Sequence, residues 1–69
     1  MADLNSRLLQ AHALGDLRAL VGLYARAAEQ LDDEDERAFF LTQAHVLALD
    51  VAHPLEPELA QELHAMGRL

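Results

Sequence analysis

The chain has 69 residues, of which 52% are hydrophobic and only 4% aromatic, so its core must consist mostly of leucine, alanine and valine. A single domain of this length gains only marginal stability from its core, and the lack of cysteine excludes disulfides and thiolate metal sites as further support. The net charge of −7, with five arginines placed singly along the chain, argues against binding to nucleic acid or to an anionic membrane surface.

The N-terminal half predicts two helices joined by a tight turn. Asp3 is placed to cap the first helix, and Gly15 ends it where a left-handed conformation is needed. The apolar face of this helix consists of Leu4, Leu8, Ala11 and Leu14. Asp16 then caps a second helix, which has the clearest amphipathic pattern in the chain. Its core-facing stripe consists of Leu17, Leu20, Val21, Tyr24, Ala27, Ala28 and Leu31, and its opposite face of Arg18, Gly22, Arg26 and Glu29.

The C-terminal half begins with a third, longer helix. Asp33 and Glu36 have the spacing of a capping box, and the acidic residues around them complement the helix dipole. The helix runs from about Asp33 to Ala52, and Pro54 stops it because a residue before proline avoids helical geometry.

A fourth helix follows, since Pro57 is well suited to a first helical turn. It carries Leu59, Leu63 and Met66 on one face and ends near Gly67. Because all connections are short, consecutive helices are expected to be antiparallel neighbours. We therefore expect one all-α domain over residues 1–69, built as two helical hairpins at about 3–31 and 33–67.

An internal echo suggests a repeat. Residues 10–14 read QAHAL and residues 43–47 read QAHVL, an offset of 33 residues, which is close to the helix–turn–helix period of tetratricopeptide repeats. Residues 4–31 resemble one such repeat at Gly15 and Asp16, between the helices, and at the positions that follow, Leu17, Leu20, Tyr24 and Ala27. The second half matches less well, because Ala52-His53-Pro54 stands in place of Gly-Asp. The resemblance implies a scaffold that binds proteins or peptides rather than an enzyme.

The third helix has more apolar residues than one core face accommodates. Its core arc consists of Phe40, Leu41, Ala44, Leu47, Ala48, Val51 and Ala52. A second stripe of Phe39, Thr42, Val46 and Leu49 has the spacing of a helix–helix seam. The QAH echo aligns Thr42 with Leu9 and Val46 with Ala13. We predict a partner interface formed by Leu9, Ala13, Phe39, Thr42, Val46 and Leu49.

The sequence leaves open two ways in which this apolar surface could be covered. Either the first helix of the same chain folds over it, or a second copy or a peptide closes it. Two hairpins fall below the three or more repeats that such arrays usually need, which favours a homodimer.

Residues with catalytic or metal-binding chemistry form no known motif. The acidic run at 32–36 lacks the alternating ligands and glycine of a calcium loop, and the four histidines include no HExxH and no i, i+4 pair. We therefore assign no catalytic, cofactor or metal residues and expect a non-enzymatic interaction scaffold or adaptor. Two alternatives stay open: a small-molecule or metal-binding bundle that uses His12 and His45, and an accessory subunit of an enzyme.

The location expected from the sequence is the cytoplasm, because neither a secretory signal nor a membrane-spanning stretch is evident. The arginine-only, alanine-rich composition is typical of bacterial proteins from GC-rich genomes.

Overall fold

A computed structural model describes residues 3–69, and within them the chain forms four α-helices and no β-strand. The helices are α1 (Leu4–Leu14), α2 (Leu17–Glu29), α3 (Glu34–Val51) and α4 (Glu56–Ala65). The predicted all-α fold is confirmed, and the helix ends lie close to the predicted positions. Between residues 3 and 69 no helix is both long and apolar enough to span a membrane.

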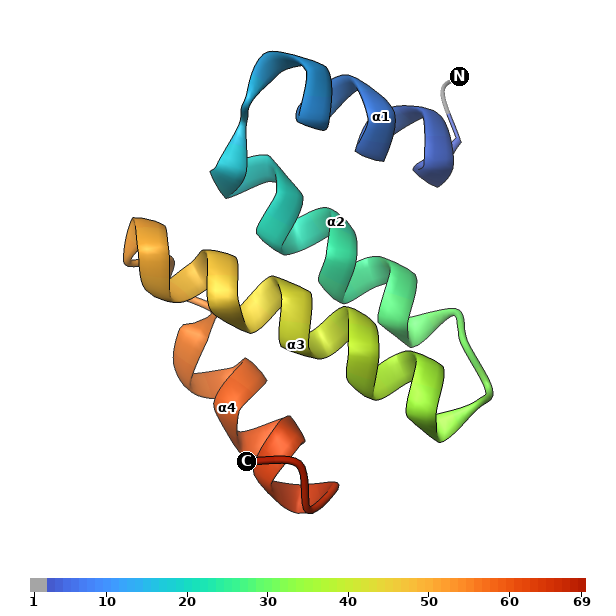
Figure 1. The fold of residues 1–69 in the computed structure, drawn as a ribbon, viewed down its shortest axis with the longest axis vertical. Coiled ribbons are helices and arrows are strands. Elements are labelled where there is room, and N and C mark those ends of the chain that lie inside the picture. The colour runs from blue at the N-terminus through green and yellow to red at the C-terminus, as the bar shows by residue number, and fades with distance from the viewer. Residues whose placement is uncertain (1–2) are drawn as a thin grey trace.

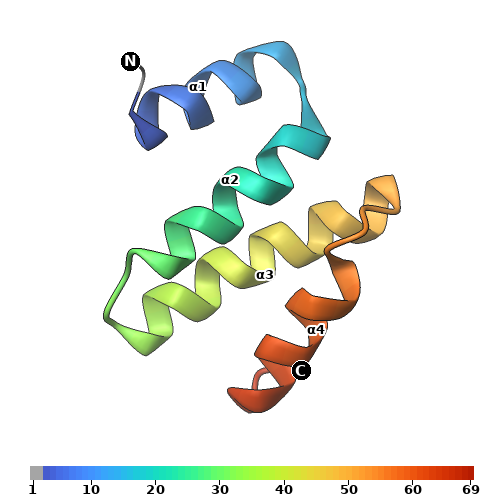
Figure 2. The same cartoon turned by 180° about the vertical axis from the view of Figure 1, so that it is seen from behind.

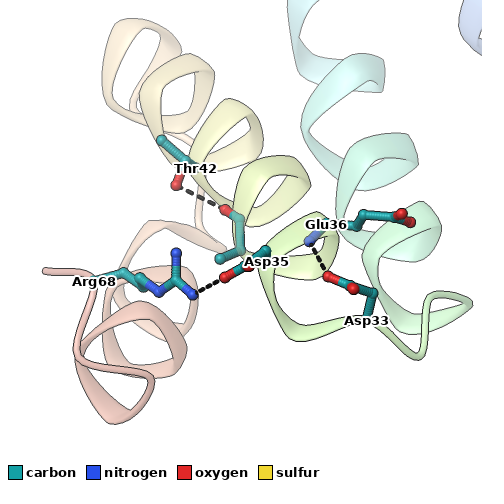
Figure 3. Close-up of polar contacts among 6 residues, drawn as sticks. Asp33, Asp35, Glu36, Thr42 and Arg68 are labelled. Atoms are coloured by element: carbon teal, nitrogen blue, oxygen red, sulfur yellow. Dashed lines mark hydrogen bonds and ion pairs between the residues drawn. The ribbon is translucent and has the colours of Figure 1, made fainter.

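The caps that the sequence predicts are formed. Asp3, Asp16 and Asp33 each accept a hydrogen bond from the backbone N–H three residues later, at 2.8, 3.1 and 3.0 Å. The Asp33 cap is visible at the start of α3 in Figure 3. Gly15 ends α1 with a φ of 66°, the left-handed conformation expected of it. Ala52 ends α3 with a φ of 53°, which is unusual for a residue that has a Cβ.

Replacing Ala52 with glycine should stabilise the protein by about 1 kcal/mol, because glycine adopts a positive φ without a steric penalty. Ala52 is exposed, so the substitution removes no packing. Urea unfolding measures the change. Gln61→Gly, at an exposed position inside α4, is the matched control and should destabilise the protein, because glycine is a poor helix former there. A lower unfolding midpoint for Ala52→Gly would contradict the left-handed conformation.

Asp3 makes the start of α1 sensitive to pH. The hydrogen bonds from Ser6, that of its backbone N–H first, lower the pKa of the Asp3 carboxyl from its ordinary value of 3.8. Because this pKa is lower in the folded than in the unfolded state, the cap stabilises α1 at neutral pH, and its contribution is lost as the pH falls through the folded-state pKa. Amide exchange at Ser6 should therefore accelerate over that acidic range. Asp3→Asn keeps an oxygen acceptor and should not show this titration; an identical acceleration in the variant would contradict the assignment.

The helices follow one another across a thin layer (Figures 1 and 2). The main contacts join α1 to α2, α2 to α3 and α3 to α4, and the α2–α3 pair is the most extensive. The Cα atoms span 33 × 27 × 14 Å, so the shortest dimension is little more than the thickness of one helix. The two predicted hairpins are thus held together by their inner helices, α2 and α3.

The core has two parts. The larger cluster joins α2, α3 and α4 and consists of Val21, Ala28, Leu41, Ala44, Ala48, Leu59 and Leu63. The smaller cluster joins α1 to α2 and consists of Ala11, Leu20 and Leu23. Most of the predicted core positions are therefore confirmed, and alanines at the α3 contacts let the helices approach closely.

Three predicted core positions are wrong. Leu14 and Leu17 are 73% and 39% exposed, because both lie beside the α1–α2 turn, whereas the cluster between these helices begins one turn away at Ala11 and Leu20. Ala52 is exposed because α3 ends there.

Candidate functional site

The apolar stripe predicted on the third helix lies on the exposed side of α3. Phe39, Val46 and Leu49 are 60%, 51% and 59% exposed, and Thr42 is exposed as well. We call these four residues the α3 strip. The alternative in which the first helix covers them is wrong, because α1 packs on α2. No segment within residues 3–69 covers the α3 strip.

Two polar side chains on this side of α3, Thr42 and Asp35, have partners within the chain. The Thr42 hydroxyl donates a hydrogen bond to the carbonyl oxygen of Ala38 at 2.7 Å, so it needs no outside partner (Figure 3). At the start of the helix, the Arg68 guanidinium donates to the carboxylate of Asp35, which raises the pKa of Arg68. Asp35 precedes Phe39 by one helical turn and therefore lies on the same side. The Asp35–Arg68 ion pair thus lies one helical turn before the α3 strip.

The other two predicted interface residues lie apart from the α3 strip. Leu9 and Ala13 are exposed on α1, Leu9 by 63%. The helix α2 lies between α1 and α3 in both views (Figures 1 and 2). The structure therefore places the six residues in two groups on separate helices.

Four aromatic rings on α1, α2 and α3 contact one another in a row that ends at Phe39 of the α3 strip. His12 on α1 lies edge-on to Tyr24 on α2, with ring centroids 5.8 Å apart, and His12 Nε2 is hydrogen-bonded to the Tyr24 hydroxyl at 2.7 Å. Tyr24 then contacts Phe40 at 5.8 Å, and Phe40 contacts Phe39 at 5.6 Å. The sequence does not reveal this row, because its members come from three helices. Phe39, at the start of the strip, thus makes an edge-to-face contact with the inner ring of Phe40, an arrangement that aromatic pairs favour.

The two histidines of the metal-binding alternative have different partners. His12 bonds to Tyr24, whereas His45 Nε2 lies 2.9 Å from the Glu56 carboxylate at the start of α4. In the described part of the chain, no three or more histidine or carboxylate side chains are grouped so as to hold a metal ion. Each of these two histidines thus joins one pair of helices, His12 joining α1 to α2 and His45 joining α3 to α4.

A groove of about 830 Å³ lies between α2 and α4. Its apolar interior includes Leu23 on α2, Leu41 on α3, and Leu55, Leu59 and Met66 beside or on α4, together with the smaller Ala19, Gly22 and Ala25 on α2. Neither His12 nor His45 lines it, and no residue of the α3 strip does. The groove is therefore a separate surface that sequence reasoning missed; the polar face predicted for the second helix forms one of its sides.

Charged side chains of both signs surround this groove: Arg7, Arg26, Arg37, Glu29, Glu58 and Glu62. The three arginines are far apart in the sequence, yet the fold brings them to one site. Within residues 3–69 none of the six side chains forms an ion pair. The groove thus has an apolar interior and an unpaired charged rim.

Comparisons with known protein families, with curated proteins and with solved structures find no match for this chain. The resemblance of residues 4–31 to a tetratricopeptide repeat stays a prediction from the sequence.

Proposed function

We propose that this protein is a non-enzymatic interaction scaffold that forms a homodimer through the α3 strip. The observation that supports this most directly is the exposure of Phe39, Val46 and Leu49 on one side of the longest helix. Taking a large apolar side chain from full exposure to full burial is worth roughly 1.5–3 kcal/mol, and these three side chains still have about half of their surface left to bury. A small domain with a thin core has much to gain from that burial.

A twofold axis through the middle of the strip would pair α3 with its symmetry copy. In such an interface the same patch is used on both molecules, so Phe39 of one copy meets the Leu49 end of the other. The strip residues recur at the spacing of a helix–helix seam, and the Thr42 hydroxyl is satisfied within its own helix. Two α3 helices could therefore pack along the strip without leaving the Thr42 hydroxyl unpaired.

Light scattering coupled to size-exclusion chromatography tests the proposal. At micromolar concentrations the mass should be twice the monomer value of 7.6 kDa and should fall towards that value on dilution. Cytoplasmic location stays a prediction, and so does the absence of catalytic activity. A monomeric mass at every concentration would refute the homodimer and leave a peptide or another protein as the partner of the strip.

A further inference from the structure

The groove between α2 and α4 is bordered by helices in an arrangement that could accommodate one more helix. Both α2 and α4 pack on α3, and the groove runs between them with Leu41 of α3 at its base. Leu59 and Met66 line the α4 side, where Leu59 is buried and Met66 is half-buried. A helix placed here would contact three helices at once, as a core helix does in a bundle.

The walls of the groove favour a helix over an extended peptide. They consist of helices, whose backbone N–H and C=O groups are paired internally, so they present no sheet edge to which an extended chain could add. An extended chain would bury unpaired backbone groups against Leu41, Leu59 and Met66, which is unfavourable. A helix satisfies its own backbone groups and presents only side chains to the groove.

Gly22 leaves room for close approach on the α2 side. A Cβ built on Gly22 would meet no atom of the chain within 4 Å, so the packing of this chain does not require glycine there. Glycine also weakens a helix interior relative to alanine. With Ala19 and Ala25 it forms a shallow side of the groove, which lets the axis of an added helix come near that of α2.

The charges at the rim define the chemistry of the occupant. On the side of α1 and α2, Arg7 and Arg26 outnumber Glu29, whereas the charged rim residues of α4 are Glu58 and Glu62; the remaining one, Arg37, lies on α3. A helix with carboxylates along one edge and lysines or arginines along the other would complement both sides. A fatty acid, with a single carboxylate, would leave the glutamates unpaired.

We propose that this groove binds one amphipathic α-helix of a partner protein, with its apolar face towards Leu41 and edges of opposite charge facing the two rims. The site shares no residue with the α3 strip, so it gives the scaffold a second binding face. The proposal does not depend on the homodimer.

The test uses the full chain and two synthetic helical peptides. Both carry leucine at positions i, i+3, i+4 and i+7; the first has glutamates along one edge and lysines along the other, and the second has lysines along both edges. In an NMR titration the first peptide should shift the amide signals of Gly22, Leu41, Leu59 and Met66, and leave those of Val46 and Leu49 unchanged. The second peptide should bind about tenfold more weakly, because its lysines meet Arg7 and Arg26.

Variants of the chain sharpen the test. A Cβ at Gly22 meets no atom within 4 Å, and the ring of Gly22→Phe would occupy the groove. Gly22→Phe should therefore weaken binding of the first peptide by about tenfold or more, whereas Gly22→Ala should change it by less than about threefold. Circular dichroism confirms that both variants fold.

Exchanging Glu58 and Glu62 for lysine tests the charged rim. It should weaken binding of the first peptide and strengthen binding of a peptide with glutamates along both edges. Val46→Glu/Leu49→Glu is the control outside the groove and should leave the affinity unchanged.

Three results would overturn the proposal. If no peptide shifts the groove signals, or if Gly22→Phe binds the first peptide as tightly as the wild type, the groove does not accept a helix. If a fluorescent fatty acid binds there and the peptides do not, the occupant is a lipid. If Gly22→Phe abolishes self-association, the occupant is a second copy of this chain.

Discussion

Replacement of Leu63 with alanine should leave a large fraction of the protein unfolded at 25 °C. Leu63 is only 1% exposed and belongs to the cluster that joins α4 to α2 and α3. Removing a buried leucine side chain in this way destabilises a protein by about 2–5 kcal/mol. A single core in a domain of this size supplies roughly 3–5 kcal/mol, so the loss is comparable to the whole stability. Circular dichroism and urea unfolding measure the effect.

Leu14→Ala is the matched control, because Leu14 is 73% exposed. It should change the free energy of unfolding by less than about 0.5 kcal/mol. Both variants must be compared at the same chain concentration, since association adds to the apparent stability. An unfolding midpoint for Leu63→Ala equal to that of the wild type would show that α4 does not contribute to the core.

The double substitution Val46→Glu/Leu49→Glu should convert the dimer into a monomer. Both positions are exposed on the isolated chain, so the fold should persist and the circular dichroism spectrum should keep its helical form. In a dimer the same positions face the partner, where a buried carboxylate without a counter-charge costs several kcal/mol. The measured mass should therefore fall to 7.6 kDa at concentrations where the wild type is dimeric.

Leu14→Glu/Leu69→Glu controls for the added negative charge. Both leucines are exposed, at 73% and 61%, and neither belongs to the α3 strip. This variant has the same net charge as the strip variant and should stay dimeric. If both variants are monomeric, charge repulsion explains the effect; if both are dimeric, the interface lies elsewhere.

The local features of the fold can be predicted from the sequence because their causes are local. Asp16 caps α2 through a hydrogen bond to the third residue after it, and Gly15 adopts a conformation that depends on its missing Cβ. Periodicity likewise identifies the outward side of α3, including Phe39 and Val46. The left-handed Ala52 was not predicted, because alanine gives no signal for that conformation.

The groove could not be predicted, because it depends on how the helices are placed in space. Arg7, Arg26 and Arg37 are on three different helices, and only the packing of α1, α2 and α3 brings them to one rim. The position of Leu9 relative to the α3 strip has the same origin. The QAH echo aligns the two helices in sequence, whereas α2 separates them in the structure.

The single-layer arrangement has a consequence for how the protein opens. The main packing of α1 is against α2, through the small cluster around Ala11, while α2, α3 and α4 share the larger one. In a structure where each helix mainly contacts its neighbours, an end helix that is held only by a small cluster can detach without disrupting the rest. Native-state hydrogen exchange should therefore divide the chain into an early-opening unit, α1, and a late-opening unit, α2 to α4. The His12–Tyr24 hydrogen bond would be broken in the first of these steps, which frees one end of the aromatic row while Phe39 stays in place.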